Sequence, residues 1–399
     1  MRLNVLLMIP SLHQGGSERQ GIRLAQLLSG TGRYRVTFAC LDRTGALLPE
    51  AESLALGEIP EFRLNSFYDR NMLTQLRRSV KLLETQAIDV VQTFDFYTNV
   101  FVLTAATLAR VPLRVGARRE TAGHRTAAQK WIERHAFLLS HVIVANSEAV
   151  RQELIGDGVR ASKVVTVYNA ADINPLMPSI LSDRAGLLRS LGLPTDPGHR
   201  FIAIVANLQS PYKDHPTFLR AAQLVNQAVP EATFVLAGEG PLIEEMRLLA
   251  HQLGIGQRTF FPGRCMQVPQ LLSLSEVCVL SSKSGEGFSN AILEYMAAAR
   301  PVVATDVGGA REAVADGESG WIVRPGDHSA MATRIIELLR NPQRALEMGQ
   351  RGRRIIEEKF APEASLARIE SLYRELLPKR ARAEVKEPRE AISHLETIE

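Results

Sequence analysis

Short apolar runs alternate with segments of helical periodicity along most of the chain. The runs expected to form strands are 5–9, 36–39, 90–93, 113–117 and 142–145, then 201–206, 233–237, 259–261, 277–280, 302–305 and 321–323. The segments expected to form helices are 19–28, 71–85, 127–139, 215–228, 241–253, 290–299 and 329–341. Alternating strands and helices are typical of parallel sheets that are covered on both faces. The pattern therefore predicts an α/β fold of two doubly wound, Rossmann-like domains that face a central cleft.

A change in composition marks the limit between these two domains. Polar sequence that contains proline follows residues 167–172 and continues as far as Pro178. At 399 residues, the chain is long enough for two domains of ordinary size. We expect a first domain over 1–170, a second over 171–361, and a charged, flexible tail over 378–399.

Composition narrows the class of protein. Hydrophobic residues make up 45% and charged residues 23% of the chain, which are values of globular proteins. Cys40, Cys265 and Cys278 are far apart, which argues against a disulfide framework or a zinc site and fits a reducing, cytoplasmic compartment. The apolar N-terminus indicates a first strand and not a signal peptide. No run approaches the roughly 20 apolar residues that a membrane span needs.

Positive charge is concentrated in the first half of the chain. Residues 1–170 hold 21 Lys+Arg and 15 Asp+Glu, a net charge of +6, and residues 171–399 hold 26 and 28, a net charge of −2. This distribution favours an anionic partner, either a lipid-phosphate acceptor or the face of an anionic membrane. The alternative is a solvated basic surface without a partner.

The stretch 284–297 carries the most specific chemistry. Glu286 lies in a loop flanked by glycines, and Glu294 follows after seven intervening residues inside a predicted helix that Ser289 or Asn290 caps. The free amides and positive end of such a helix form an anion site. A carboxylate on each side suits a ligand with both phosphate and hydroxyl groups, because carboxylates accept hydrogen bonds from sugar hydroxyls. A nucleotide sugar is such a ligand.

This Glu-Gly-Phe-Ser-Asn context with paired glutamates resembles the signature of the retaining glycosyltransferases of family 4, the group 1 transferases. The resemblance covers about residues 1–376 and implies the GT-B fold. It implies that 1–170 presents the acceptor and that 171–361 binds the nucleotide sugar. It also implies that a last helix, over 362–377, crosses back to the first domain.

The resemblance also assigns roles within the cleft. Lys213 resembles the family's phosphate-binding lysine, which stabilises the negative charge on the departing diphosphate. Glu294 would bind the ribose hydroxyls and Glu286 a hydroxyl of the transferred sugar. The other expected donor-binding residues are Gly15, Gly16, Gly238, Glu239, Gly240, Gly263, Arg264, Gly287, Phe288, Ser289 and Asn290. For the glycine turns, tight packing without a ligand is the alternative.

The chain departs from the family's pattern at two cationic positions. Many relatives carry an arginine upstream of the lysine, where this chain has Asn207 and Gln209. Many also carry a histidine after the strand at 113–117, where this chain has Arg118 and Arg119. The hypothesis is that this arginine pair contacts the diphosphate or an anionic acceptor, with Arg118 among the catalytic residues. The basic stretch that follows, from His124 to Arg134, is a candidate lip for the acceptor or membrane.

Absent motifs exclude other chemistries. No Asp-x-Asp follows a strand to hold a divalent metal, and no Gly-x4-Gly-Lys-Ser/Thr loop binds a nucleoside triphosphate. We therefore expect no metal and no cofactor, and no nucleic-acid partner. The expected activity is metal-independent, retaining transfer of a sugar from a UDP- or GDP-sugar to a lipid-linked or polysaccharide acceptor of the cell envelope. The alternatives are a small soluble acceptor, or a nucleotide-binding scaffold without activity. The expected location is the cytoplasm, with peripheral contact at the inner membrane.

Overall fold

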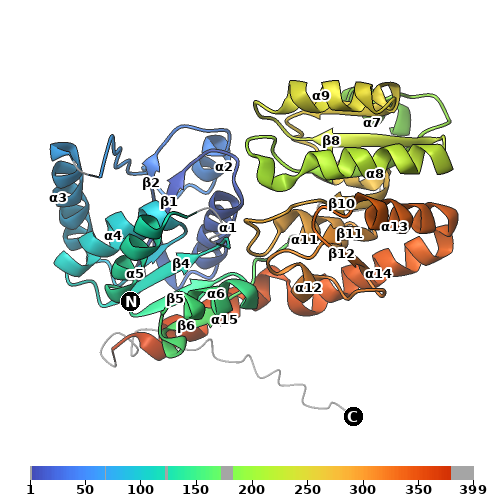
Figure 1. Cartoon of the computed structure of the whole chain (residues 1–399). Helices are drawn as coiled ribbons and strands as arrows, with labels where there is room; N and C mark the ends of the chain where they lie inside the picture. Colours follow the sequence, from blue (N-terminus) through green and yellow to red (C-terminus); the bar gives the residue numbers. More distant parts are fainter. Residues whose placement is uncertain (1, 68, 122–124, 172–182, 379–399) are drawn as a thin grey trace, which may run out of the picture.

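The computed structural model describes residues 2–67, 69–121, 125–171 and 183–378. Its first half is a six-stranded parallel sheet in the order β2-β1-β3-β4-β5-β6 (Figure 1). The strands are β1 (Leu3–Ser11), β2 (Tyr34–Asp42), β3 (Val90–Thr93), β4 (Leu113–Arg118), β5 (Val142–Ala145) and β6 (Val164–Thr166). The helices are α1 (Gly16–Gly30), α2 (Leu48–Ser53), α3 (Arg70–Thr85), α4 (Phe96–Leu108), α5 (Ala127–Leu138) and α6 (Glu148–Gly156).

The second half repeats this plan, with strand order β12-β11-β10-β7-β8-β9. Its strands are β7 (Arg200–Val205), β8 (Ala232–Ala237), β9 (Thr259–Gly263), β10 (Ser275–Leu280), β11 (Val302–Thr305) and β12 (Gly320–Val323). Its helices are α7 (Arg184–Ser190), α8 (His215–Ala228), α9 (Ile243–Gln252), α10 (Val268–Leu274), α11 (Asn290–Ala297), α12 (Ala310–Ala313), α13 (His328–Arg340) and α14 (Pro342–Lys359). A 3₁₀ turn, η4 (Pro211–Lys213), connects β7 to α8.

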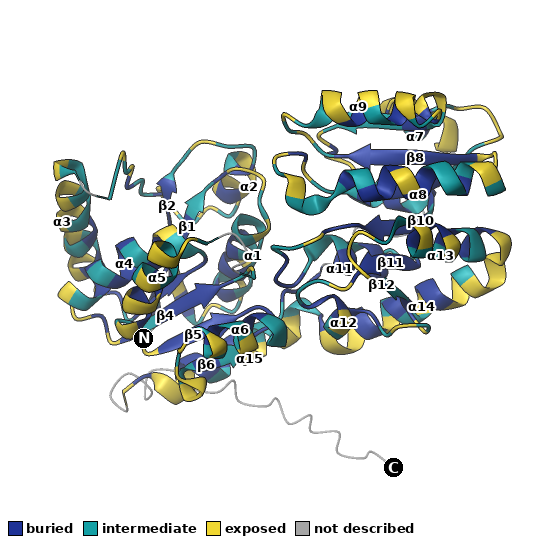
Figure 2. Cartoon of the chain, viewed as in Figure 1, coloured by how far each residue is buried: buried dark blue, intermediate teal, exposed yellow. Residues whose placement is uncertain are grey.

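Both sheets are buried on both faces, which explains why their strands are continuously apolar. Successive side chains of a strand point to opposite faces of the sheet. In β1, Leu7 and Ile9 therefore pack in one core layer, and Leu6 and Met8 pack in the layer on the other face. Figure 2 shows the buried strands between helices whose outer faces are exposed. The predicted pair of doubly wound domains is confirmed.

The last helix, α15 (Pro362–Leu376), packs against the first half of the molecule (Figure 1). Ile369 and Leu372 belong to the same core layer as Leu7 and Ile9 of β1. The Tyr373 hydroxyl donates a 2.6 Å hydrogen bond to the side-chain oxygen of Gln92, in β3. The expected crossover of the C-terminal helix is therefore confirmed.

Several elements of the structure were not expected from the sequence pattern, namely β6 and the helices α2, α4, α6, α7, α10, α12 and α14. Helix α4 escaped notice because it is apolar on nearly all sides and lacks a polar stripe. None of the helices within the described ranges is long and apolar enough to cross a membrane. The proline-containing connection at 172–178, His124 and nearly all of the proposed tail lie outside the described residues.

Candidate functional site

A cleft of about 670 Å³ lies between the two halves. It is bordered by the loop between β1 and α1, the loops after β7 and β8, and the N-terminal end of α11. The expected site residues that line it are Gly15, Gly16, Lys213, Gly238, Glu239, Arg264, Glu286, Gly287, Phe288, Ser289, Asn290 and Glu294. The structure therefore brings together most of the residues that the sequence singled out, from positions as distant as 15 and 294.

Lys213 and Glu286 form the most closely coupled pair of the cleft. The Lys213 Nζ lies 2.6 Å from Glu286 Oε1, and the Ser282 hydroxyl donates a 2.6 Å hydrogen bond to the same oxygen. Burial alone would raise the pKa of Glu286, but the Lys213 ammonium and the Ser282 hydroxyl outweigh it and lower the pKa below its usual value. At neutral pH the cleft therefore holds an ionised carboxylate directly beside an ammonium group.

Glu294 faces α1 from the second turn of α11. Its Oε1 accepts a 2.8 Å hydrogen bond from Arg19 Nη1, across the boundary between the halves. Burial raises the pKa of Glu294, although Arg19 and Arg23 oppose this shift. The Ser289 hydroxyl caps α11 by accepting from the backbone N–H of Ile292. The helix consequently presents its positive end to the cleft between two carboxylates.

The turn after β8 requires its glycines. A Cβ on Gly238 would lie 2.0 Å from the carbonyl oxygen of Ala206. Gly240 has a φ of +153°, and a Cβ there would lie 2.2 Å from the carbonyl carbon of Leu208. Between the two glycines, Glu239 forms an ion pair with Arg264 at the cleft. Gly240 and Gly263, which were both expected to bind the donor, do not line the cleft.

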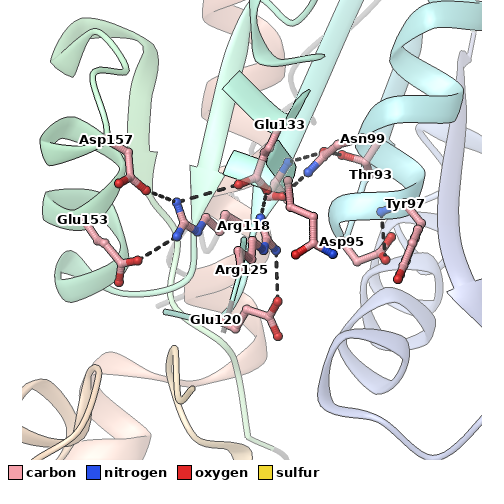
Figure 3. Close-up of polar contacts among 12 residues, drawn as sticks. Thr93, Asp95, Tyr97, Asn99, Arg118, Glu120, Arg125, Glu133, Glu153 and Asp157 are labelled. Atoms are coloured by element: carbon pink, nitrogen blue, oxygen red, sulfur yellow. Dashed lines mark hydrogen bonds and ion pairs between the residues drawn. The ribbon is translucent and has the colours of Figure 1, made fainter. Parts of the chain in front are cut away.

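Arg118 is placed elsewhere than expected. Its side chain is 1% exposed and does not line the cleft. Figure 3 shows it among carboxylates instead: Nη2 lies 2.7 Å from Glu153 Oε1, Nη1 lies 3.0 Å from Asp157 Oδ2, and Glu133 is 3.8 Å away. This cation connects the end of β4 to α5 and α6, and we correct the hypothesis that it faces the donor. Its neighbour Arg119, the first residue after β4, lines the cleft instead.

Further residues of the cleft were not expected to bind a ligand, among them Arg19, Asn146 and Asn169. Arg19 lies next to the Gly-Gly-Ser-Glu segment, and Asn146 follows β5. Asn169 was noticed only as part of the boundary between the domains. Its side-chain N–H groups donate to the Phe288 carbonyl at 2.7 Å and to Asn290 Oδ1 at 2.8 Å. The location of Asn169 in the connection between the two domains was the one feature of the sequence that could have indicated a place in the cleft.

The two halves are held closely together beside the cleft. The Glu312 carboxylate, on α12, accepts hydrogen bonds from the backbone N–H groups of Glu148 at 2.7 Å and Ala149 at 2.9 Å. It therefore satisfies the free N-terminal amides of α6, in the other half of the molecule. On Gly287, a Cβ would lie 2.2 Å from the carbonyl oxygen of Arg119. A glycine is needed there for the halves to approach this closely.

Two protein-family models match the chain. The model of the "Glycosyl transferases group 1" matches residues 189–355, and that of "Glycosyltransferase Family 4" matches residues 14–174. Among curated proteins, the chain is 37% identical over 142 residues to a putative glycosyltransferase, EpsD, of Bacillus subtilis, covering 36% of this chain and 37% of that protein. It is 27% identical over 239 residues to the N-acetyl-alpha-D-glucosaminyl L-malate synthase of Bacillus anthracis, covering 60% of each. The chain thus spans less than two thirds of the length of these relatives.

Solved structures share the fold over nearly the whole chain. HepE of Anabaena, in complex with UDP and glucose, superposes with a TM-score of 0.83 at 22% identity, over 93% of this chain and 99% of that one. The sucrose-phosphate synthase of Thermosynechococcus elongatus superposes with a TM-score of 0.74 at 19% identity, over 94% and 99%. At these identities, the likeness concerns the fold.

Proposed function

Because the chain belongs to the group 1 glycosyltransferases of family 4, we propose that it transfers a sugar from a UDP- or GDP-sugar to an acceptor. One observation carries this proposal: Lys213, Glu286 and Glu294 line a single cleft together with the N-terminal end of α11. That set offers cationic and amide donors for a diphosphate, and carboxylate acceptors for the hydroxyl groups of its sugars.

The donor would lie along the side of the cleft that the second half of the chain forms. The diphosphate fits between the Lys213 ammonium and the amides that precede α11, and the ribose fits against Glu294. Because Glu294 is paired with Arg19 in the cleft, the ribose hydroxyls have to share or replace that contact. Glu286, kept ionised by Lys213, is suited to accept a hydrogen bond from a hydroxyl of the transferred sugar.

For the chemical step, we propose transfer with retention of configuration and without a metal or cofactor. The acceptor hydroxyl would attack from the face that the diphosphate leaves, and a phosphate oxygen of the leaving group would take its proton. Lys213 and the α11 amides would stabilise the negative charge that develops on the leaving group, which removes the need for a metal in that role. Chelation with EDTA should then leave turnover unchanged.

For the acceptor, we propose a lipid-linked or polysaccharide molecule of the cell envelope, reached at the cytoplasmic face of the inner membrane. The first half of the chain has a net charge of +6. On α5, Trp131 and Leu138 are 63% and 70% exposed, and exposed Arg134 lies between them along the chain. Basic residues beside exposed apolar ones suit the surface of an anionic bilayer. A curated relative is a GDP-mannose-dependent phosphatidylinositol monomannoside mannosyltransferase of Mycolicibacterium smegmatis, 29% identical over 164 residues.

A small soluble acceptor is the alternative, which the N-acetyl-alpha-D-glucosaminyl L-malate synthase of Bacillus anthracis favours, because its name points to malate as the acceptor. Sedimentation with anionic liposomes separates the two: the membrane proposal expects binding at low salt that is lost at high salt and in the double variant Trp131→Ser, Leu138→Ser. Matched substitution of exposed Leu346, in α14, is the control. A soluble acceptor would be favoured if the protein sediments equally with neutral and anionic vesicles, or if it sediments with neither.

Release of UDP or GDP from purified protein and donor sugar tests the activity itself. We expect slow hydrolysis of one donor series in wild type, unchanged by EDTA and greatly reduced in Glu294→Gln. If the protein binds nucleotide but never releases it from any donor sugar, with or without envelope acceptors, a scaffold without activity is the better account.

A further inference from the structure

The charged side chains that line the cleft are matched almost completely. Its carboxylates are each held by a cation: Glu120 by Arg125, Glu239 by Arg264, Glu286 by Lys213 and Glu294 by Arg19. Among the lysines and arginines of the lining, Arg119 alone has no carboxylate within ion-pair distance in the described part of the chain. This guanidinium is the remaining positive charge of the cleft.

The surroundings of Arg119 are poor in compensating groups. Its Nη2 donates to Asn169 Oδ1, a neutral oxygen, and its guanidinium carbon lies 5.6 Å from the centre of the Phe94 ring. Burial lowers the pKa of Arg119 to about 10, which reflects the cost of keeping its charge away from water. The carboxyl that acts on it is Glu18, whose own pKa is raised to about 7, mainly by burial. A partly buried cation that lacks a carboxylate partner is costly unless a ligand supplies one.

The position of Arg119 indicates which part of a ligand it would meet. Its backbone lies against Gly287, and the backbone N–H of Thr121 donates to the Glu286 carbonyl at 3.3 Å. The segment 119–121 therefore runs beside the loop that carries Glu286. In the proposed function, this is where the transferred sugar and the adjoining phosphate lie.

Resting on that proposed function, we propose that Arg119 binds an anionic group of the donor on the sugar side of the cleft. A guanidinium has several N–H donors in a planar fork, which suits the paired oxygens of a phosphate or carboxylate. Two donor groups share this chemistry: the phosphate next to the sugar, and the carboxylate of a uronic-acid sugar. Either would neutralise the remaining cation of the cleft.

Calorimetric titration of Arg119→Gln tests this inference and separates the two sources. The probes are UMP, UDP, UDP-glucose and UDP-glucuronate, or the matching guanosine and mannose/mannuronate series if wild type prefers GDP. If Arg119 contacts the phosphate next to the sugar, the variant should bind UDP, UDP-glucose and UDP-glucuronate about 10- to 100-fold more weakly than wild type. Its affinity for UMP, which lacks that phosphate, should be unchanged. A contact with a sugar carboxylate predicts a loss of that size for UDP-glucuronate alone.

Arg77→Gln, on the exposed side of α3, removes the same charge far from the cleft and should change none of these affinities. Arg119→Lys keeps the charge but loses the fork, so an intermediate affinity is expected, and this variant serves if Arg119→Gln does not fold. Wild-type affinity for every probe in a folded Arg119→Gln would overturn the inference. Failure of wild type to bind either nucleotide series would instead refute the proposed function.

Discussion

Replacing Arg118 by Met is predicted to reduce stability and to leave the cleft's binding properties intact. The substitution keeps most of the side-chain volume but removes a cation that contacts Glu133, Glu153 and Asp157. Had Arg118 faced the ligand, as its sequence position suggested, the same substitution would reduce turnover and hardly change stability. The two outcomes are easily distinguished.

The expected loss in the free energy of unfolding depends on the carboxylates that remain when Arg118 is removed. Breaking a buried ion pair by removing one partner costs about 3–5 kcal/mol. Here, the side chains of Glu153 and Asp157 are 29% and 26% exposed and regain water, and Glu133 keeps its contact with Arg125. We therefore expect the lower end, about 3 kcal/mol. For a domain of this size, that corresponds to a fall in Tm of roughly 6–12 °C.

Differential scanning calorimetry measures this fall, and nucleotide titration well below the Tm measures the cleft of the folded variant. Arg77→Met is the matched control, with an expected change in Tm of less than about 2 °C, because substitutions of exposed residues are nearly neutral. Adding Glu133→Gln to Arg118→Met should restore part of the stability, since it removes a buried negative charge. An unchanged Tm together with a more than roughly tenfold loss of donor hydrolysis would refute the reasoning.

Three further predictions address the cleft and the contact between the halves. Lys213→Ala should lower donor hydrolysis by about 10²-fold, measured as nucleotide release, as expected for one lost donor to the leaving group; normal turnover would refute its role. Gly287→Ala should separate the halves, because its Cβ meets the Arg119 backbone, and should increase the radius of gyration in X-ray scattering; an unchanged radius with unchanged nucleotide affinity counts against this contact. Burial and, less strongly, Asp95 raise the pKa of Glu18 from 4.5 to about 7, so the folded state binds the proton more tightly and stability falls as pH rises through this range. Glu18→Gln should therefore raise Tm above pH 7 and lose that advantage near pH 4.5; equal Tm differences at both would contradict the shift.

Local sequence was sufficient for many of the elements, although not for α14, and for the site built around one of them. Helix α11 and its two flanking glutamates could be predicted, because a cap, a helical run and a glycine-flanked loop are all encoded within a few residues. Helix α4 could not, because a helix that is buried on most sides has no polar stripe to reveal its period.

Contacts between residues that are far apart in the sequence could not be predicted from the spacing of residues. The pairing of Arg19 with Glu294 depends on how the two halves meet, and no local pattern specifies it. Which of the two arginines points into the cleft depends on how the chain is oriented at the end of β4. A shift of one residue there would exchange the directions of the two side chains. The sequence identified the cationic pair, and only the three-dimensional structure separated the structural arginine from the one in the cleft.

The central claim is that one cleft holds the diphosphate and the ribose of a nucleotide-sugar donor. A crystal structure with UDP or GDP bound tests it most directly. We predict phosphate oxygens within hydrogen-bond distance of Lys213 and of the amides before α11, with the ribose hydroxyls on Glu294. A nucleotide bound away from these groups, or held in the opposite direction with its ribose beside Glu286, would contradict the account.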